Sequence, residues 1–210
     1  MLDVQRLIGH VFPSRRVAGH ELLAGGLINT TLKVHFDGHI EPVVLRVYRD
    51  GPAACNKEVA LHDLIHQQVP VARIIYAHAE ENDDLPSFTV LEYVAGITFQ
   101  QLKRTNDLEA IRQAAASAGE TLARIGSFEF PAPGDLLVNQ GQLVVGEKFI
   151  DGPDPIPRLL DRFLASTILQ QRVGADLIER LHDFMWSYAP VLPDLENDRS
   201  LVHNDYGNRN

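Results

Sequence analysis

The sequence contains a single cysteine, Cys55, among its 210 residues, so no disulfide can form within the chain. It has no uncharged apolar run of about 18 residues, the length that a membrane-spanning helix needs. Its first residues also lack the basic start and apolar run of a secretory signal peptide. These absences predict a protein of the reducing cytoplasm with no membrane partner.

Positive charge is scarce as well. Lysine and arginine together number 19 against 28 aspartates and glutamates, which gives a formal net charge of -9. Because nucleic-acid binding needs clustered cations, we expect no nucleic-acid partner. The sequence has no His-Glu-x-x-His motif, no Cys-x-x-Cys pair and no internal repeat, which argues against a zinc site and against a solenoid.

What is present is enough apolar residue, 45% of the chain, to bury a core. Alternating apolar residues, β-branched residues and glycine turns predict that the first ninety residues form an antiparallel sheet with one helix. The expected strands are Glu21–Ala24, Thr30–Phe36, Pro42–Tyr48, Arg73–Ala79 and Ser87–Val94, and the expected helix is Asn56–Gln68.

Beyond Gly96 the composition changes to that of helices. We expect a helix from Asp107 to Ile125, a short strand pair across Asn139-Gln140-Gly141, and two further helices at Pro157–Gln171 and Ala175–Tyr188. The fold class predicted is therefore α+β. We place a sheet-based first lobe at residues 1–95 and a mostly helical second lobe at residues 96–210.

The strongest local pattern is His203-x-Asp205-x-x-x-x-Asn210, directly after the apolar Ser200-Leu201-Val202. Phosphoryl transfer uses a carboxylate to orient the attacking hydroxyl and an oxygen ligand for magnesium, and Asp205 and Asn210 have these chemistries. Taken alone, the pattern also fits an ordinary turn. It leaves open a metal-dependent hydrolase that uses His203 and Asp205, although no further ligands stand at a suggestive spacing.

A cation stands inside an apolar strand at Arg46, between Leu45 and Val47. Burying a cation is costly unless an anion pairs with it, and Glu58 in the following helix is the candidate partner. Such a pair can hold the α and β phosphates of a nucleotide. The alternative is an arginine that faces solvent, because alternation puts Arg46 on the face opposite its two neighbours.

Two backbone features complete the pattern. Gly25-Gly26, followed by Asn29, forms a turn between the first two strands where backbone amides can approach phosphate oxygens. The segment Phe88–Gly96 leads from the sheet region into the helices, so its backbone can meet a purine edge as a hinge between lobes. Singly, each is also explained by a plain hairpin or by a buried strand that ends at glycine.

The order of these features is that of protein-kinase-like enzymes. In detail the whole chain resembles the aminoglycoside phosphotransferase family. The resemblance rests on Gly25-Gly26-x-x-Asn29, Val44-Leu45-Arg46-Val47, Lys57-Glu58, Val69-Pro70-Val71-Ala72-Arg73, Leu91-Glu92-Tyr93-Val94-Ala95-Gly96 and His203-Asn204-Asp205-Tyr206-Gly207-Asn208-Arg209-Asn210. It implies a protein-kinase-like fold of two lobes.

The resemblance also implies roles for single residues. Asp205 is expected to be the catalytic base, Asn210 a magnesium ligand, and Arg46 with Glu58 the pair that positions the phosphates. The nucleotide is expected to contact the glycine turn with Asn29 and the hinge residues, which are Glu92, Tyr93 and Val94.

The sequence departs from the family in two places. Arg46 stands where relatives often carry lysine, which keeps the charge and adds a bidentate fork. A second magnesium-binding aspartate, which the family has shortly after the catalytic loop, is missing because the sequence stops at Asn210. The alternatives are a fragment of a longer enzyme and a natural truncation that cannot hold two metals; we expect the fragment, inactive by itself.

The expected function is transfer of the γ-phosphoryl group of ATP, or of GTP, to a hydroxyl of a small molecule with Mg²⁺. The alternative is a catalytically incomplete nucleotide-binding module. The sequence determines neither the substrate nor the oligomeric state, and fold similarity alone does not imply antibiotic resistance.

Overall fold

A computed structural model describes residues 2–23, 28–80, 85–146, 155–188, 190 and 199–203. Its backbone contacts divide the chain into two compact units. The first is formed mainly by Met1–Gly126 and Leu137–Val144, the second mainly by Ser127–Leu136 and Val145–Leu201. The α+β fold class predicted from the sequence is confirmed.

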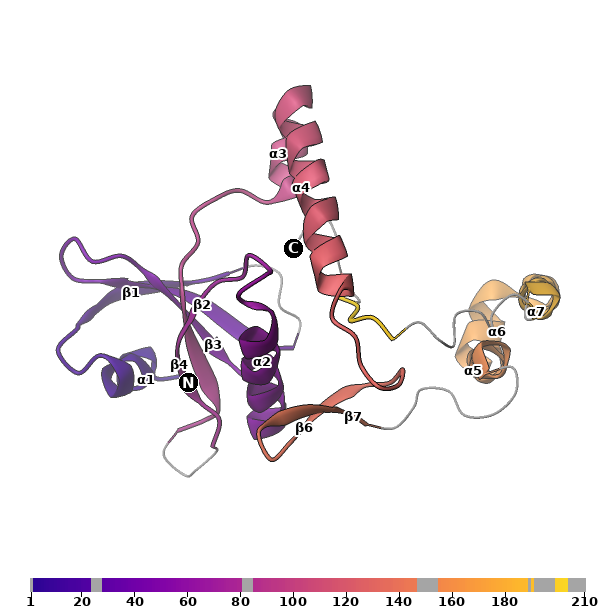
Figure 1. Cartoon of the computed structure of the whole chain (residues 1–210), viewed down its shortest axis with the longest axis horizontal. Coiled ribbons are helices and arrows are strands. Elements are labelled where there is room, and N and C mark those ends of the chain that lie inside the picture. Colours follow the sequence, from indigo (N-terminus) through magenta and orange to yellow (C-terminus); the bar gives the residue numbers. More distant parts are fainter. Residues whose placement is uncertain are drawn as a thin grey trace. The chain divides into compact units, whose positions relative to one another are not determined.

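The first unit is built on a five-stranded antiparallel sheet with the strand order β1-β2-β3-β5-β4 (Figure 1). The strands are β1 (Val17–Leu22), β2 (Thr30–Phe36), β3 (Val43–Val47), β4 (Ile74–His78) and β5 (Phe88–Glu92). All five predicted strands are therefore present, with ends shifted by a few residues. Among them, β1 begins four residues before its predicted start at Glu21.

Helix α1 (Val4–Val11) closes one face of this sheet. Its Asp3 cap accepts a hydrogen bond from the Arg6 amide at 3.0 Å. Val4, Leu7 and Ile8 follow helical spacing and pack on inward-facing residues of the sheet, which are Leu32, Val34, Phe36, Val43, Leu45, Phe88 and Val90. These residues form the core of the unit.

Helix α2 (Gly51–Ile65) lies on the other face, so that β4 appears between α1 and α2 in Figure 1. The helix begins five residues before the predicted Asn56. Gly51 adopts a φ of 66°, which favours glycine, and Pro52 fits the first turn because amides there have no partner within the helix. The Gly51-Pro52 pair therefore starts the helix.

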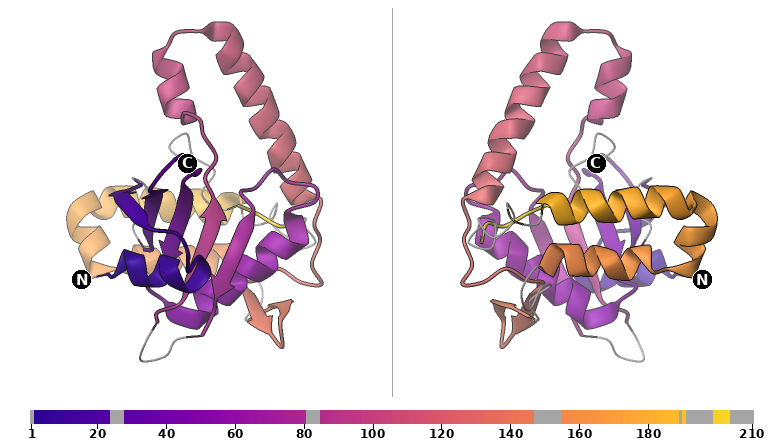
Figure 2. Two further views of the ribbon diagram at one scale, coloured as in Figure 1. Left: turned by 90° about the vertical axis from the view of Figure 1, so that its left-hand side faces the viewer. Right: turned by 90° about the vertical axis from the view of Figure 1, so that its right-hand side faces the viewer.

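A helical hairpin of α3 (Phe99–Arg104) and α4 (Leu108–Gly126) follows the sheet (Figure 2). We predicted α4 but not α3. The short helix is fixed by a capping box in which the Thr98 hydroxyl accepts from the Gln101 amide at 3.2 Å and the Gln101 side chain accepts from the Thr98 amide at 2.8 Å. Asp107 caps α4 by accepting from the Ala110 amide at 3.0 Å.

The predicted strand pair after α4 is present as β6 (Leu136–Asn139) and β7 (Gln142–Val145). Gln140 and Gly141 have φ angles of 49° and 78°, the pattern of a hairpin turn whose two central residues are both left-handed. The sequence Asn139-Gln140-Gly141 therefore forms the turn that we predicted for it.

Three helices form most of the second unit: α5 (Pro155–Leu164), α6 (Thr167–Val173) and α7 (Ala175–Tyr188). Helix α7 has the bounds that we predicted. The single helix predicted at Pro157–Gln171 is wrong, since the extended backbone of Ser166 divides it into α5 and α6. Serine favours such a position before a helix. Within the described residues, no helix combines the length and the apolar character that crossing a bilayer requires.

Candidate functional site

The candidate site lies on the face of the sheet that α1 does not cover. Strand β3 is the central strand, and its Arg46 stands opposite Thr31 of β2 and Thr89 of β5. Residues paired across antiparallel strands share a face, and neighbours along a strand alternate. Arg46 therefore points to the side of α2, whereas Leu45 and Val47 pack into the core below α1.

Arg46 meets Glu58 of α2 in a direct ion pair between Nη1 and Oε1. The pairing that the sequence predicted is confirmed. Both side chains are half-buried, with 33% of Arg46 and 27% of Glu58 exposed. Burial disfavours the charge of Arg46, but the hydrogen bond and the charge of Glu58 outweigh it, so the pKa of Arg46 is raised and the guanidinium stays charged.

Two buried groups surround the pair. The hydroxyl of Tyr48 lies 3.1 Å from Oγ1 of Thr89, and burial together with the Glu58 carboxylate raises the pKa of Tyr48. On α2, the fully buried thiol of Cys55 points to the carbonyl oxygens of His78 and Phe88 at 3.6 and 3.9 Å. Burial and, as the smaller cause, the charge of Glu58 together raise the pKa of Cys55 to about 11. Both groups are therefore neutral near neutral pH.

A cavity of about 280 Å³ adjoins the ion pair between α2 and the sheet. Its lining combines Arg46, Glu58 and His62 with apolar side chains, which are Leu61, Ile65, Val71, Ala72, Ile74 and Leu91. This volume is below the roughly 300 to 1,000 Å³ of pockets for drug-sized ligands. It has room for a phosphate-sized group next to the guanidinium.

The predicted hinge begins at the end of β5. The Glu92 carboxylate accepts a hydrogen bond from the Arg73 amide at 2.9 Å, and the Glu92 amide donates to the Arg73 carbonyl at 3.0 Å. The Glu92 amide is therefore not available to a ligand. Two residues later, Val94 is 66% exposed, and neither its amide nor its carbonyl is hydrogen-bonded to any residue in the described ranges.

Tyr93, between these two residues, packs on Lys33 of β2. The ammonium of Lys33 lies 4.1 Å from the centre of the Tyr93 ring and 3.5 Å from the Glu21 carboxylate. Tyr93 and Glu21 together raise the pKa of Lys33, with Tyr93 the larger cause. A second cation thus lies on the same face as Arg46, since Lys33 pairs with Val44, two residues before Arg46.

The glycine turn lies at the end of the β1–β2 hairpin. Gly25 and Gly26 are outside the described residues. Asn29 is half-buried, and its side-chain oxygen accepts from the Arg49 amide at 3.4 Å. A cavity of about 370 Å³ opens beside it, lined by Leu22, Ile28, Asn29, Thr30, Val47, Tyr48 and Arg49.

Of the predicted catalytic loop, only His203 belongs to the described residues, and it is exposed. Asp205 and Asn210 lie outside the described residues, so their roles stay predictions. Of the predicted site residues, the structure thus brings Arg46 and Glu58 into contact, on the central strand of the sheet and on α2.

Sequence reasoning missed three residues on this face. Val44, Leu91 and Lys33 form one row across three strands, with Val44 opposite Lys33 on one side and opposite Leu91 on the other. The signal was available, because Val44 stands two positions before Arg46 and shares its face by alternation. The sequence does not contain the strand register, which is what places Lys33 and Leu91 beside Val44.

Comparison with known proteins identifies a family and solved structures that share this architecture. A sequence model described as the phosphotransferase enzyme family matches residues 19–210. A search of curated protein sequences finds no match.

Solved structures of aminoglycoside phosphotransferase APH(4)-Ia share the fold. A thermostable mutant in a ternary complex with AMP-PNP and hygromycin B is 18% identical, with a TM-score of 0.53 over 85% of this chain and 56% of that one. The protein reported without named ligands is 17% identical, with a TM-score of 0.55 over 90% and 60%. A thermostable mutant with ADP and hygromycin B is 17% identical, with a TM-score of 0.56 over 90% and 60%. The chain spans 56 to 60% of the length of these proteins.

Proposed function

The chain belongs to the phosphotransferase enzyme family, and on that premise we propose that it is the nucleotide-binding part of an ATP-dependent kinase. The reaction moves the γ-phosphoryl group of ATP to a hydroxyl of a small molecule. Asp205 accepts the proton of that hydroxyl as it attacks. We propose that the boundary between the two lobes of this kinase lies between residues 95 and 96.

The observation that carries this proposal is the Arg46–Glu58 ion pair. Phosphoryl transfer depends on positioning and on electrostatic stabilisation of phosphate charge. A guanidinium that is half-buried, always charged and held in place by a helix carboxylate supplies both. Its planar fork offers several N–H donors, so Arg46 can contact phosphate oxygens while Glu58 retains one of them.

The hinge supports binding of a purine base. Because the Val94 amide and carbonyl have no hydrogen-bond partner among the described residues, they are available to pair with a base edge. The Glu92 amide is engaged with Arg73, so we restrict the proposed role of Glu92 to its carbonyl. Val44 and Leu91 give the face an apolar surface against which a base can lie.

Magnesium fits the donor chemistry proposed for the catalytic loop, since an asparagine oxygen is a hard ligand of the kind that Mg²⁺ takes. Asn210 would hold it. When bound, the ion neutralises charge on the phosphates. Gly25, Gly26 and Asn29 are proposed to contact the phosphates through the turn between β1 and β2.

The substrate is proposed only as a small molecule with a hydroxyl group. The solved relatives include complexes with AMP-PNP or ADP and with hygromycin B, which supports a nucleotide and a small-molecule acceptor here. GTP is the alternative nucleotide. The single buried cysteine and the net charge of -9 support a cytoplasmic protein without a nucleic-acid partner.

Two measurements test the proposal. Mg-ATP is expected to raise the melting temperature of the chain, because a ligand that binds the native state stabilises it by mass action. Phosphoryl transfer by the full-length protein is then assayed against aminoglycosides, choline, sugars and amino alcohols. Asp205→Ala is expected to lower turnover by about 10² to 10⁴-fold.

The outcomes separate the two candidate functions. Unchanged turnover in Asp205→Ala contradicts the role of Asp205. A thermal shift with no turnover on any acceptor supports the alternative, a nucleotide-binding module without catalysis. Absence of both effects contradicts nucleotide binding by this chain.

A further inference from the structure

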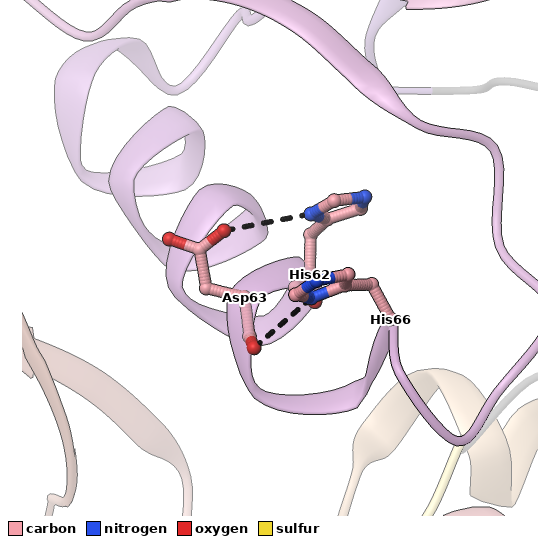
Figure 3. Close-up of side chains that lie close together, drawn as sticks. All are labelled: His62, Asp63 and His66. Atoms are coloured by element: carbon pink, nitrogen blue, oxygen red, sulfur yellow. Dashed lines mark hydrogen bonds and ion pairs between the residues drawn. The ribbon is translucent and has the colours of Figure 1, made fainter.

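The last turn of α2 gathers three side chains that can coordinate a metal: His62, Asp63 and His66 (Figure 3). The two histidines are four residues apart, so they lie on the same face of the helix one turn from each other. One ligand atom of each of the three residues lies within 4.8 Å of the others. Among the described residues, this is the group of three or more such side chains that meets this criterion.

The hydrogen bonds of His66 determine which of its nitrogens can bind. Its Nδ1 lies 3.1 Å from the carbonyl oxygens of both His62 and Asp63. A carbonyl oxygen only accepts, so Nδ1 carries the proton. The lone pair of neutral His66 is therefore on Nε2, and a metal-binding histidine is commonly oriented in this way by a bond from its other nitrogen to a carbonyl.

His62 offers a nitrogen that the fold does not use. Its side chain is only 14% exposed, and its Nδ1 is buried without a hydrogen-bond partner. The Asp63 carboxylate lies beside it, with Oδ1 3.6 Å from Nδ1. An unpaired buried nitrogen is costly, and a metal ion is one way to satisfy it.

These distances are close to those of a tetrahedral centre. Metal–nitrogen and metal–oxygen bonds of about 2.0 to 2.2 Å place neighbouring ligand atoms roughly 3.3 to 3.6 Å apart. Nδ1 of His62 and Oδ1 of Asp63 already have such a separation. The imidazole rings are stacked, with centres 5.1 Å apart and planes 4° apart, so the exposed His66 must turn to aim its lone pair at a shared ion.

We propose that His62, Asp63 and His66 form a binding site for one transition-metal dication, with Zn²⁺ as the ion of choice. Two imidazoles and a carboxylate suit zinc, whereas Mg²⁺ prefers oxygen ligands in octahedral geometry. The position favours a cation further, because the carbonyl end of a helix carries partial negative charge. Water completes the coordination. None of the three residues belongs to the set proposed above for magnesium or the nucleotide.

The location gives the site a structural effect. His62 also lines the cavity that contains Arg46 and Glu58, and Glu58 lies one turn before it on α2. An ion bound to His62 and His66 crosslinks the last turn of the helix that carries Glu58. Zinc binding is therefore expected to stabilise the folded chain against unfolding.

The test is zinc titration of the metal-stripped chain by calorimetry, together with thermal melting. The expected result for the wild type is one Zn²⁺ per chain, a higher melting temperature, and no competition from excess Mg²⁺. His66→Gln, which removes an exposed ligand, is expected to weaken binding at least about tenfold. Asp63→Asn is expected to weaken it less, since the amide oxygen can still coordinate. His39→Gln is the matched control, because His39 is exposed and lies outside the cluster.

Folding of the variants is checked by circular dichroism and by the melting temperature without metal. His66→Gln should match the wild type in this respect, so its loss of affinity reports a lost ligand. Equal zinc affinity in the wild type and His66→Gln would overturn the proposal. An equal loss in His39→Gln, or displacement of zinc by Mg²⁺, would overturn it as well.

Discussion

The two faces of the five-stranded sheet differ in the kind of side chain that packs on each. Below α1, the centre of the face is apolar, and Val34, Leu45, Phe88 and Val90 are fully buried, while Tyr76 and His78 of β4 lie at its edge. Beside α2, the face carries charges in pairs, and Arg46 with Glu58 is the most buried of these. Adjacent residues of one strand, Leu45 and Arg46, therefore belong to different environments.

This difference implies that the apolar face mainly stabilises the fold and that the charged face is the one suited to bind a ligand. An apolar face gains its free energy from burial and offers a ligand nothing polar to contact. The charged face gains less, because half-buried ion pairs recover little more than the cost of desolvation, yet its cations can meet an anion. Substitutions on the apolar face should therefore lower mainly the free energy of unfolding, whereas substitutions on the charged face should also weaken nucleotide binding.

The largest effect is expected from Phe88→Ala on the apolar face. Phe88 is fully buried, and removing such a ring from a core costs about 3 to 5 kcal/mol of unfolding free energy. Urea denaturation measures the loss. Phe184→Ala is the control, since Phe184 is 56% exposed and its removal should cost far less. Equal losses in the two variants would contradict the assignment of the core.

The next effect is expected from Arg46→Met on the charged face. The variant leaves Glu58 half-buried without its cation, which should cost about 1 to 3 kcal/mol of unfolding free energy. It should also abolish the thermal shift with Mg-ATP, and Arg46→Lys should restore part of that shift because the charge returns without the fork.

Arg16→Met provides the comparison for this prediction. Arg16 pairs with Asp37 at 3.8 Å on the surface, where both side chains are mostly exposed, so its loss should cost at most about 1 kcal/mol. A normal Mg-ATP shift in Arg46→Met, with the fold intact, would separate the ion pair from nucleotide binding.

A smaller effect is expected at alkaline pH. The pKa of Cys55 rises from 9.0 to about 11 in the folded chain, so the fold favours the neutral thiol. Its contribution to stability is complete below pH 9 and is lost as pH rises toward 11. Urea denaturation at a series of pH values should show this loss in the wild type.

Cys55→Ala is expected to reduce the pH dependence between 9 and 11 while lowering stability overall, because it leaves a cavity. Some loss should persist above pH 10, since burial also raises the pKa of Tyr48. Only Cys55→Ala combined with Tyr48→Phe should flatten the profile. A wild type with constant stability from pH 8 to 11 would refute the proposed environment of both groups.

The smallest effect is expected from Lys33→Met, which removes an ammonium that contacts the Tyr93 ring and Glu21. Contacts of this kind contribute little to stability, because solvent screens the charge of the ammonium. A double-mutant cycle with Tyr93→Leu measures the coupling directly. A coupling of zero would show that the two side chains are neighbours without a stabilising contact.

Patterns with a strong local cause were predictable from the sequence. Alternation located β2, and β-branched and aromatic content located β3. Asn139-Gln140-Gly141 identified a hairpin turn because few sequences accept two left-handed residues. The partner of Arg46 could be inferred because a cation inside an apolar strand needs an anion nearby. The chemistry of single residues thus identified the central ion pair of the site.

Other features depend on contacts that no local pattern contains. The row formed by Lys33, Val44 and Leu91 exists only once three strands are in register. Helices α1 and α3 did carry signals, namely the cap at Asp3 and the capping box of Thr98 and Gln101, which we did not use.

The candidate metal site at His62, Asp63 and His66 has a sequence signal of its own. His62-Asp63-Leu64-Ile65-His66 has the histidine spacing of His-Glu-x-x-His, with aspartate in the second position. Whether such a pair can bind an ion depends on the hydrogen bonds of each ring. For His66 those bonds go to carbonyl oxygens three and four residues earlier at the end of α2, and the geometry of that end is visible only in the fold.

The single thiol gives this chain a built-in probe. Cys55 is the one cysteine in the sequence and is shielded between α2 and the sheet, so a thiol-modifying reagent reaches it only when that contact opens. The rate of labelling therefore reports how often α2, the helix that carries Glu58 and His62, separates from the sheet. A nucleotide held by Arg46, or an ion held by His62, can be recognised by how much each slows the modification of this sulfur.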